Sequence, residues 1–238
     1  MRSCNLAADQ NCECEFAFAF RGEVRMSQGA KPASQARSRA TRDRLVAALD
    51  GLLREKDFES ITIADLAREA GLAVGTVYRR FENKDAFIPV VFELYRERLE
   101  SYTAGDGRIE VEPADGLQVA LHAIVRSAWG FMQREGHLLR TAHLYARLRP
   151  DLVGEEWQAY LDAALASARQ LISLFNEEIH VANHDVAAQM LAYLLNTMLI
   201  ERGLYPDEGA GALLTIDDDD FVSASADTLF GYLATPSR

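Results

Sequence analysis

The sequence predicts an all-α protein, with a three-helix helix-turn-helix domain near the N-terminus and a larger helical domain after it. Apolar residues recur at helical spacing over most of the chain, and no convincing run alternates as a half-buried strand would. Two short helical segments flank Gly71, which is the pattern of a helix-turn-helix. With 238 residues, 49% of them hydrophobic, the chain can bury a sizeable core, which argues against a disordered protein.

The net charge of −11 is unevenly distributed. Residues 31–98 carry thirteen Lys or Arg against eleven Asp or Glu, whereas residues 99–238 carry nine against twenty-one. A nucleic-acid site needs positive charge only locally. The distribution therefore allows a DNA-binding domain joined to an acidic body.

Residues 1–38 are expected to form a flexible arm, because they are rich in small and polar residues without sustained periodicity. All three cysteines, Cys4, Cys12 and Cys14, lie there, so no disulfide framework is expected and a cytoplasmic location is favoured. No secretory signal or membrane span is recognisable. A basic stretch follows Met26, which leaves Met1 and Met26 as alternative starts and predicts that residues 1–25 are dispensable.

Residues 39–88 are expected to form the helix-turn-helix domain. Its first helix starts at about Arg39 and places Leu45, Val46, Leu49, Leu52 and Leu53 on one face. A second helix follows Thr62, whose spacing to Asp65 predicts a capping box, and it ends at Gly71.

A third helix is expected over Val74–Phe81. Asn83 is expected to cap a fourth, and Pro89 either bends that helix or delays its start.

Residues 89–238 are expected to form the second domain, with helices at 115–134, 137–148, 151–180, 184–204 and 218–234. The segment Val186–Ile200 is apolar almost all round, which in a soluble protein indicates burial in a core or an interface. The run Asp217–Asp220 suits the N-terminus of the last helix, where the helix dipole favours negative charge.

The third helix carries the strongest functional pattern. At about 100° per residue, Val74, Val77 and Phe81 share one face, and the opposite face holds Gly75, Thr76, Arg79 and Arg80. Guanidinium groups match phosphate oxygens and guanine edges, and glycine allows close approach of a helix to DNA. A surface helix with two solvated arginines would show the same pattern, so the helix alone does not decide between the two interpretations.

The run from Ile61 to Phe87 closely resembles the signature of the TetR family of transcriptional regulators. Three blocks occur in order: T-x-x-x-[IL]-A-x-x-A-G-[VL] from Thr62, G-T-[VL]-Y-x-x-F from Gly75, and K-[DE]-x-[LF] from Lys84. The resemblance covers about residues 41–88, and the remainder is similar only as a helical domain of suitable length.

The resemblance implies that Thr62, Thr76, Tyr78 and Lys84 contact phosphates of double-stranded operator DNA. Arg79 and Arg80 occupy base-reading positions, although for Arg80 both a base and a phosphate contact stay open. The implied DNA-binding residues are Thr62, Gly75, Thr76, Tyr78, Arg79, Arg80 and Lys84. Ala73 replaces a frequent serine, so one cap or phosphate bond is expected to be missing. Arg37, Arg39 and Arg42 can add phosphate contacts or remain solvated.

The resemblance also implies that the second domain binds a small-molecule effector and mediates homodimerisation. The candidate ligand-binding residues are Trp129, Met132, His143 and Trp157, and ordinary core packing is the alternative for each. The last two helices are expected to form the dimer through Leu191, Leu195, Met198 and Phe230.

No cofactor or metal site is expected. His180 and His184 have the spacing of helical metal ligands, but a predicted loop separates them and no third ligand accompanies them. An enzyme on a helical bundle is disfavoured, because the sequence has no G-x-S-x-G, H-E-x-x-H or phosphate-binding glycine loop. The alternatives left open are a repressor or an activator, and a regulator with or without small-molecule control.

Overall fold

The computed structural model describes residues 32–235, and every regular element in that range is helical. The helices are α1 (Pro32–Glu55), α2 (Ile63–Glu69), α3 (Val74–Tyr78), α4 (Ile88–Ala104), α5 (Leu117–Leu148), α6 (Pro150–Leu174), α7 (His184–Leu204) and α8 (Asp218–Ala234). Four short 3₁₀ turns, at Phe58–Ser60, Asp85–Phe87, Pro113–Asp115 and Gly211–Leu213, connect them. The predicted all-α class is confirmed.

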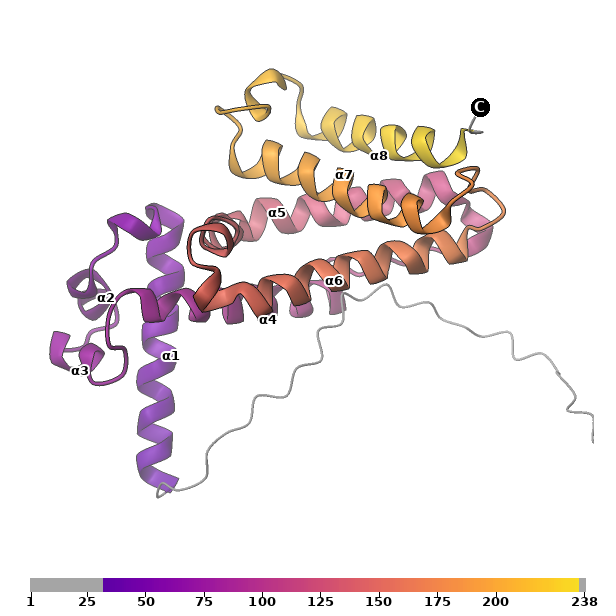
Figure 1. Ribbon diagram of the computed structural model, residues 1–238. Coiled ribbons are helices and arrows are strands. Elements are labelled where there is room, and N and C mark those ends of the chain that lie inside the picture. The colour runs from indigo at the N-terminus through magenta and orange to yellow at the C-terminus, as the bar shows by residue number, and fades with distance from the viewer. Residues whose placement is uncertain (1–31, 236–238) are drawn as a thin grey trace, which may run out of the picture.

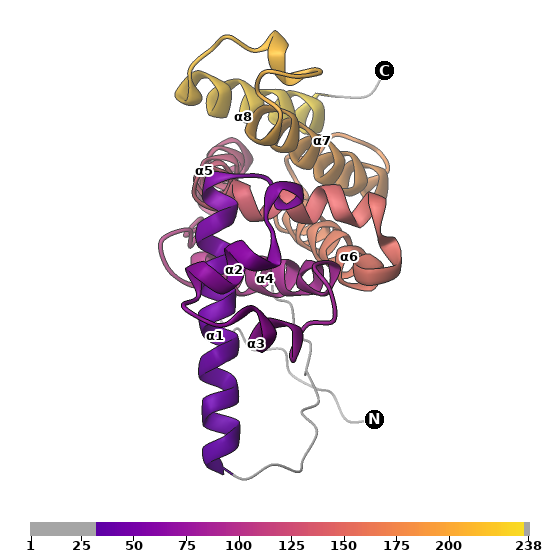
Figure 2. The same cartoon turned by 90° about the vertical axis from the view of Figure 1, so that its left-hand side faces the viewer.

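Figure 1 shows a small head made by α1–α3 at one end and a body of long helices, α5–α8, at the other. The helix α4 leaves the head and runs along the body, where it packs against α5 and α6. Figure 2 shows α8 at the far side of the body from the head helices α2 and α3. None of the helices between Pro32 and Ala234 combines the length and apolarity needed to cross a membrane.

The first helix begins at Pro32, seven residues before the predicted start at Arg39, so the expected arm does not extend to residue 38. Proline is well suited to the first helical position, because its missing N–H would have no partner there. The expectations for Cys4, Cys12, Cys14, the alternative starts and the dispensable residues 1–25 all lie outside the described residues.

In the head, the predicted buried face of α1 is confirmed, with Leu45, Leu49, Leu52 and Leu53 at most 6% exposed. The third helix is shorter than predicted, since it ends at Tyr78 rather than Phe81. Phe81 instead stacks on Phe87 with 3.9 Å between the ring centroids. This stacking closes the head against the start of α4.

Pro89 lies in the first turn of α4, which confirms the delayed start rather than a bend. Asn83 does not cap α4 as expected, because α4 begins only at Ile88 with Phe87 as its N-cap. The Asn83 Oδ1 instead accepts a hydrogen bond from the amide of Ala86, at 3.1 Å, in the short turn before α4. Asp217 caps α8 by accepting from the amide of Asp220 at 2.8 Å, as the acidic run predicts.

The predicted break at Gly136 is wrong, because α5 continues through it to Leu148. A glycine inside a helix costs about 1 kcal/mol relative to alanine. Burial of Leu138, Leu139 and Ala142 immediately beyond Gly136 outweighs that cost.

The helix α6 ends at Leu174, six residues before the predicted end at residue 180. The chain then turns so that the Glu178 carboxylate accepts hydrogen bonds from the amide of Leu117 at 3.0 and 3.1 Å. Leu117 is the first residue of α5. The amides in the first turn of a helix have no partner within the helix, so the amide of Leu117 needs an acceptor from outside it. This long-range cap joins the segment after α6 to the start of α5. His180 lies in the loop before α7 and His184 is the first residue of α7, so a loop separates them as expected.

The helices α5 and α7 approach each other closely at Gly203, and a substitution there tests the packing of the body. A Cβ atom at Gly203 would lie 2.4 Å from Cγ and 2.8 Å from Sδ of Met132, whereas one at Gly51 would meet nothing within 4 Å. We expect Gly203→Ala to lower the free energy of unfolding by about 1–3 kcal/mol through overpacking. The matched Gly51→Ala should raise it by about 0.5–1 kcal/mol through helix propensity. Urea unfolding at one protein concentration measures both, and equal effects would contradict the crossing geometry.

Candidate DNA interface and regulatory cavity

The helix α2 is fixed at both ends by local interactions that the sequence predicts. Thr62 accepts a hydrogen bond from the amide of Asp65 at 3.0 Å, and the Asp65 carboxylate accepts from the amide of Thr62 at 3.1 Å. The Lys56 ammonium, followed by the bonds from Thr62, holds the pKa of Asp65 well below its usual range. At the other end, Gly71 has a φ of +61°, and the amide of Leu72 bonds to the carbonyl of Ala67 at 2.8 Å. The capping box and the C-terminal glycine are both confirmed.

These two ends set the turn into α3, whose outer face is open to solvent. Gly75, Tyr78, Arg79 and Arg80 are exposed and Thr76 is half-buried, while Val77 is completely buried against the head. Nothing lies within 4 Å of a Cβ atom built on Gly75, so the fold of the head does not itself require a glycine there. The open space over Gly75 lets the backbone of α3 approach an external surface closely.

The side chains of the two arginines are held by other groups of the head. Arg79 donates from Nη2 to the hydroxyl of Thr76 at 3.0 Å, and Arg80 donates to the hydroxyl of Ser38 on α1 at 3.0 Å. A prearranged guanidinium loses less conformational entropy when it binds a base or a phosphate. Ser38 was not singled out from the sequence, because only the fold brings α1 beside α3.

Lys84 lies immediately before the turn Asp85–Phe87, which leads into α4. Its ammonium donates to the carbonyl of Glu59 at 2.7 Å and lies 4.8 Å from the centroid of the Phe58 ring. Burial lowers the pKa of Lys84, although the nearby Glu59 and Asp85 carboxylates oppose this. The lysine is therefore anchored to the head at the turn Phe58–Ser60.

Two sequence expectations for this surface need correction. Val74 does not pack into the head, because it is 42% exposed, so it adds an apolar side chain to the outer surface of α3. Arg42 pairs with Glu93 of α4 instead of remaining free. Ala73 precedes α3 without any side-chain cap, as its replacement of serine predicts.

Residues 45–90 match the family model of bacterial regulatory proteins of the tetR family. The chain belongs to the TetR family. The match spans the head and the start of α4, which are the elements that present Thr62, the α3 face and Lys84. The protein is thus a DNA-binding transcriptional regulator, and members of this family are regulators rather than enzymes.

Solved structures share the fold of this TetR protein at low sequence identity. The TetR family regulator PfmR from Thermus thermophilus aligns with a TM-score of 0.56 and 17% identity, over 79% of this chain and 97% of its own. The fatty acid degradation regulator FadR from Bacillus halodurans aligns with a TM-score of 0.56 and 17% identity, over 86% of this chain and 97% of its own. NalD, the secondary repressor of the MexAB-OprM multidrug efflux pump in Pseudomonas aeruginosa, aligns with a TM-score of 0.54 and 18% identity, over 83% of this chain and 98% of its own. No curated protein matches the sequence.

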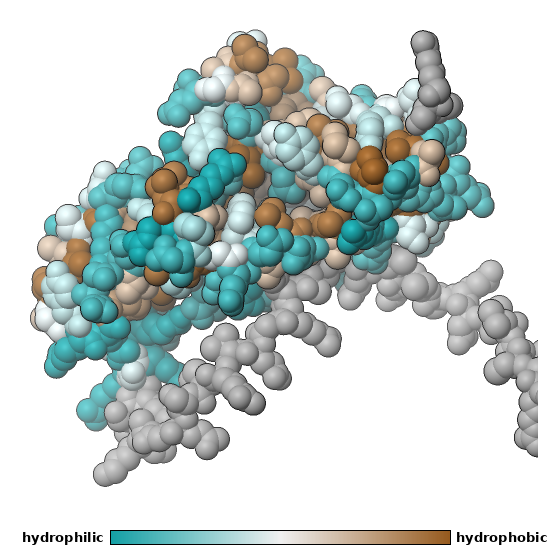
Figure 3. Space-filling view, in the orientation of Figure 1, coloured by the Kyte–Doolittle hydropathy of each residue, from teal (hydrophilic) through white to brown (hydrophobic). Residues whose placement is uncertain are grey.

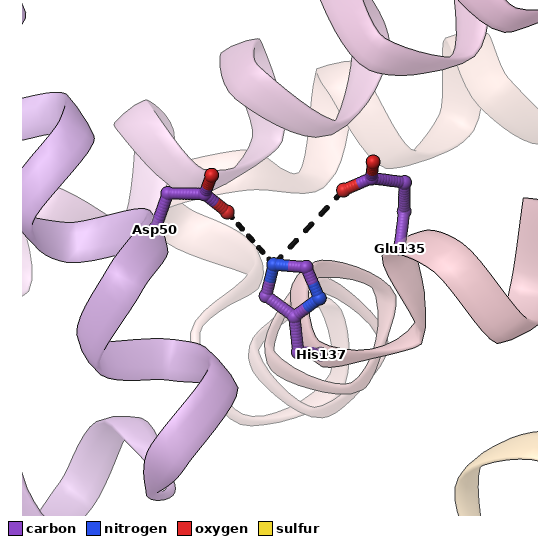
Figure 4. A group of neighbouring side chains, drawn as sticks. All are labelled: Asp50, Glu135 and His137. Carbon is purple, nitrogen blue, oxygen red and sulfur yellow. Dashed lines mark hydrogen bonds and ion pairs between the residues drawn. The ribbon is translucent and has the colours of Figure 1, made fainter.

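A group of charged residues joins the head to the body. We call it the junction cluster: Asp50 and Arg54 of α1, Arg98 of α4, and Glu135 and His137 of α5. Figure 4 shows Asp50 and Glu135 on either side of the His137 ring, with His137 Nε2 2.7 Å from Asp50 Oδ1 and 4.0 Å from Glu135 Oε2. Because a carboxylate only accepts, Nε2 of His137 must carry a hydrogen. Sequence reasoning missed this cluster, since Asp50 and His137 are 87 residues apart.

The positive charges in the junction cluster come from arginines. Arg54 lies 3.5 Å from Asp50 and 3.4 Å from Glu135, and Arg98 lies 3.2 Å from Asp50. Burial raises the pKa of Asp50, but the hydrogen bond from His137 and the two guanidinium groups outweigh it and lower the pKa overall. The three side chains Asp50, Glu135 and His137 have the types and proximity of metal ligands. Arg54 and Arg98 already neutralise both carboxylates, so the group works as an ion-pair network without a metal.

The body contains a partly open cavity of about 120 Å³ between α4, α5, α6 and α7. Its walls are mostly apolar, and among the described residues that line it none is charged. Of the four predicted ligand-binding residues, Met132 lines this cavity, together with Phe131 and Tyr160 from the same stretch of sequence.

The other three predicted ligand-binding residues lie beside the cavity. Trp129 packs on Phe221 of α8 with 4.8 Å between ring centroids. Trp157 stacks on Tyr160, with 5.1 Å between the ring centroids. His143 is 4% exposed and lies 3.3 Å from the Tyr205 hydroxyl. Burial, aided by the nearby Arg147, lowers the pKa of His143 to about 4. His143 is therefore a neutral core residue at physiological pH.

The predicted dimerisation residues divide into two groups. Leu191 is 3% exposed, Leu195 is half-buried, and both line the cavity inside their own subunit. The rotation of α7 that places them there does not follow from the sequence, because the helix is apolar almost all round. Met198 and Phe230 are half-buried at the surface of α7 and α8.

The DNA interface generates a prediction with two contrasting variants. If Arg79 reads a base edge, Arg79→Ala costs about 1–3 kcal/mol on the operator and relaxes specificity at one position. If Lys84 binds a phosphate, Lys84→Ala should weaken all sequences alike and lower the salt slope by about one. Arg126→Ala, on the body, is the matched control and should change neither. Fluorescence anisotropy on operator and random duplexes measures these effects, and equal loss on both for Arg79→Ala would exclude base reading.

Proposed function

We propose that this TetR protein is a homodimeric repressor that binds a palindromic operator and leaves it when a small molecule occupies the cavity. The single observation that carries the proposal is the mostly apolar cavity among α4–α7, which is connected through α5 to α1, the helix that supports the DNA-binding surface. The residues proposed to contact DNA are Thr62, Gly75, Thr76, Tyr78, Arg79, Arg80 and Lys84.

The connection runs through one segment of α5. Met132 and Leu139 line the cavity, and Glu135, within one helical turn of each, belongs to the junction cluster. A ligand that displaces Met132 or Leu139 would also move Glu135 relative to Arg54 of α1. Since close-packed interiors transmit small displacements, the proposal links occupancy of the cavity to the position of the head.

The head and body touch at a second place, and we propose that this contact limits the movement to a rotation. Phe58 meets the ring of Tyr145 at 5.2 Å, and the Tyr145 hydroxyl donates to Glu59 at 2.8 Å. Arg149 at the end of α5 pairs with Asp85 in the turn before α4. The ligand-bound head would therefore pivot about the junction rather than detach from the body.

An exposed stripe on α7 supports dimerisation. Val186 is 45% exposed, Tyr193 is 63% exposed, and the half-buried Met190 lies between them at helical spacing. Figure 3 shows apolar side chains gathered over α7 and α8, among polar ones. We propose that this stripe, with Met198 and Phe230 beside it, packs against its symmetry mate. Two heads would then face half-sites about one helical turn apart.

The test is selection from random DNA followed by sedimentation. We expect the protein to select a palindrome and to sediment as a dimer at micromolar concentration. Val186→Glu with Tyr193→Glu should give a monomer whose operator affinity falls by roughly 100-fold or more, because the second half-site contact is lost. Leu161→Glu, on the exposed side of α6, is the matched control and should leave the dimer intact. A non-palindromic selected site, or a dimer unaffected by both α7 changes, would contradict the proposal.

A further inference from the structure

The cavity contains polar side chains, but their hydrogens are already used within the protein. The hydroxyl of Tyr102 donates to the carbonyl of Ser127 at 3.1 Å, and that of Ser127 donates to the carbonyl of Gly107 at 2.7 Å. Thr103 donates to the carbonyl of Leu99 at 3.0 Å, and Ser167 donates to that of Ala163 at 3.0 Å. These oxygens can therefore accept a hydrogen bond from an occupant, but they have no hydrogen left to donate.

A chain of hydrogen bonds crosses the remaining polar part of the wall. Tyr95 bonds to Tyr160, and the Tyr160 hydroxyl donates to Oδ1 of Asn196 at 2.9 Å. The Asn196 amide donates in turn to the carbonyl of Ala192 at 2.9 Å. Burial raises the pKa of both tyrosines, so they stay protonated and uncharged. The second amide hydrogen of Asn196 is the one donor of this chain that no internal bond uses.

These observations restrict the occupant by charge. A carboxylate or phosphate in the cavity would lose its hydration and find neither a cation nor a set of donors on the wall. An ammonium group would likewise meet no carboxylate among the lining residues. A neutral molecule does not lose the hydration of a charge when it enters the cavity. One hydroxyl group on it could donate a hydrogen bond to a hydroxyl oxygen of the wall.

The volume restricts the occupant by size. The cavity holds about 120 Å³, and an apolar cavity of roughly 150 Å³ in a protein interior stays dry and accepts a single benzene ring. Phe131, Tyr102 and Tyr160 contribute aromatic surfaces to the wall, which suit the face or edge of another ring.

We infer that the cavity binds a neutral, single-ring aromatic compound that carries at most one hydroxyl group, and that it excludes carboxylates and amines of the same size. The inference rests on the proposed function for the claim that this site is the regulatory one. The binding chemistry itself follows from the wall and does not depend on release from DNA.

The test uses full-length protein and four probes of matched size: toluene, p-cresol, benzoate and benzylamine at pH 7.5. We expect toluene and p-cresol to raise the melting temperature by roughly 3–6 °C at ten times their Kd. Isothermal titration gives the Kd, and p-cresol should bind at least as tightly as toluene because it can donate one hydrogen bond. Benzoate and benzylamine should give no shift. Binding of benzoate or benzylamine as tight as that of p-cresol, or no shift with either neutral probe, would overturn the inference.

A cavity-filling variant locates the site. Ala164 lines the cavity, whereas Ala159 lies on the exposed side of the same helix, α6. Ala164→Leu should abolish the shift by p-cresol, and Ala159→Leu should retain it. Far-UV circular dichroism and cooperative thermal unfolding show that both variants are folded, independently of operator binding. A shift that survives in folded Ala164→Leu would place the probe elsewhere and overturn the assignment.

A measurement of release from the operator distinguishes failure of this inference from failure of the proposed function. If p-cresol binds in the cavity without changing operator affinity, the ligand chemistry holds and release by ligand fails. If a charged compound releases the protein from its operator while neutral rings neither bind nor release it, release holds and the ligand chemistry fails.

Discussion

The arrangement of this protein depends on the junction cluster, where two carboxylates are buried between the head and the body. The Glu135 side chain is 5% exposed and that of Asp50 is 14% exposed, so neither can rely on water for solvation. Each needs the guanidinium of Arg54, and Asp50 also needs Arg98 and His137. Removing one partner from such a network leaves a poorly compensated charge. The cluster therefore holds α1, α4 and α5 in one relative position.

The helix α5 carries this constraint into the body. Its 32 residues extend past the head, the cavity and α8, and its N-terminus is capped by Glu178. Along α5, the cluster residues Glu135 and His137 lie between the cavity residues Met132 and Leu139. A rigid helix fixed at both ends is suited to transmit a displacement from the cavity to α1.

The sequence predicts the head better than the body, because the head is specified by local interactions. The bonds of Thr62 to Asp65 and the left-handed Gly71 are separated by few residues, and their types alone define the turn geometry. The limit of this reasoning shows at Val74, where burial depends on how a five-residue helix is set against α1.

In the body, the deciding interactions are distant in sequence. The cap at the start of α5 depends on Glu178 reaching Leu117, and the continuity of α5 through Gly136 depends on burial against neighbouring helices. Apolar pattern identified α7 as a buried helix but did not reveal that Leu191 and Leu195 face the cavity while Tyr193 faces outward. The candidate DNA-binding residues could be named from the signature, whereas the cavity wall and the junction cluster required the fold.

The central claim is that the junction cluster fixes the head relative to the body, and a distance measurement tests it directly. Spin labels would be placed at Glu69 on α2 and Ser173 on α6, both exposed, in protein whose native cysteines are replaced by serine and which is diluted with unlabelled protein. The account predicts a narrow distribution of distances in the otherwise unchanged protein and a clearly broader one in Glu135→Gln, with Glu156→Gln on the surface of α6 as the unaffected control. An equally narrow distribution in folded Glu135→Gln would contradict the claim.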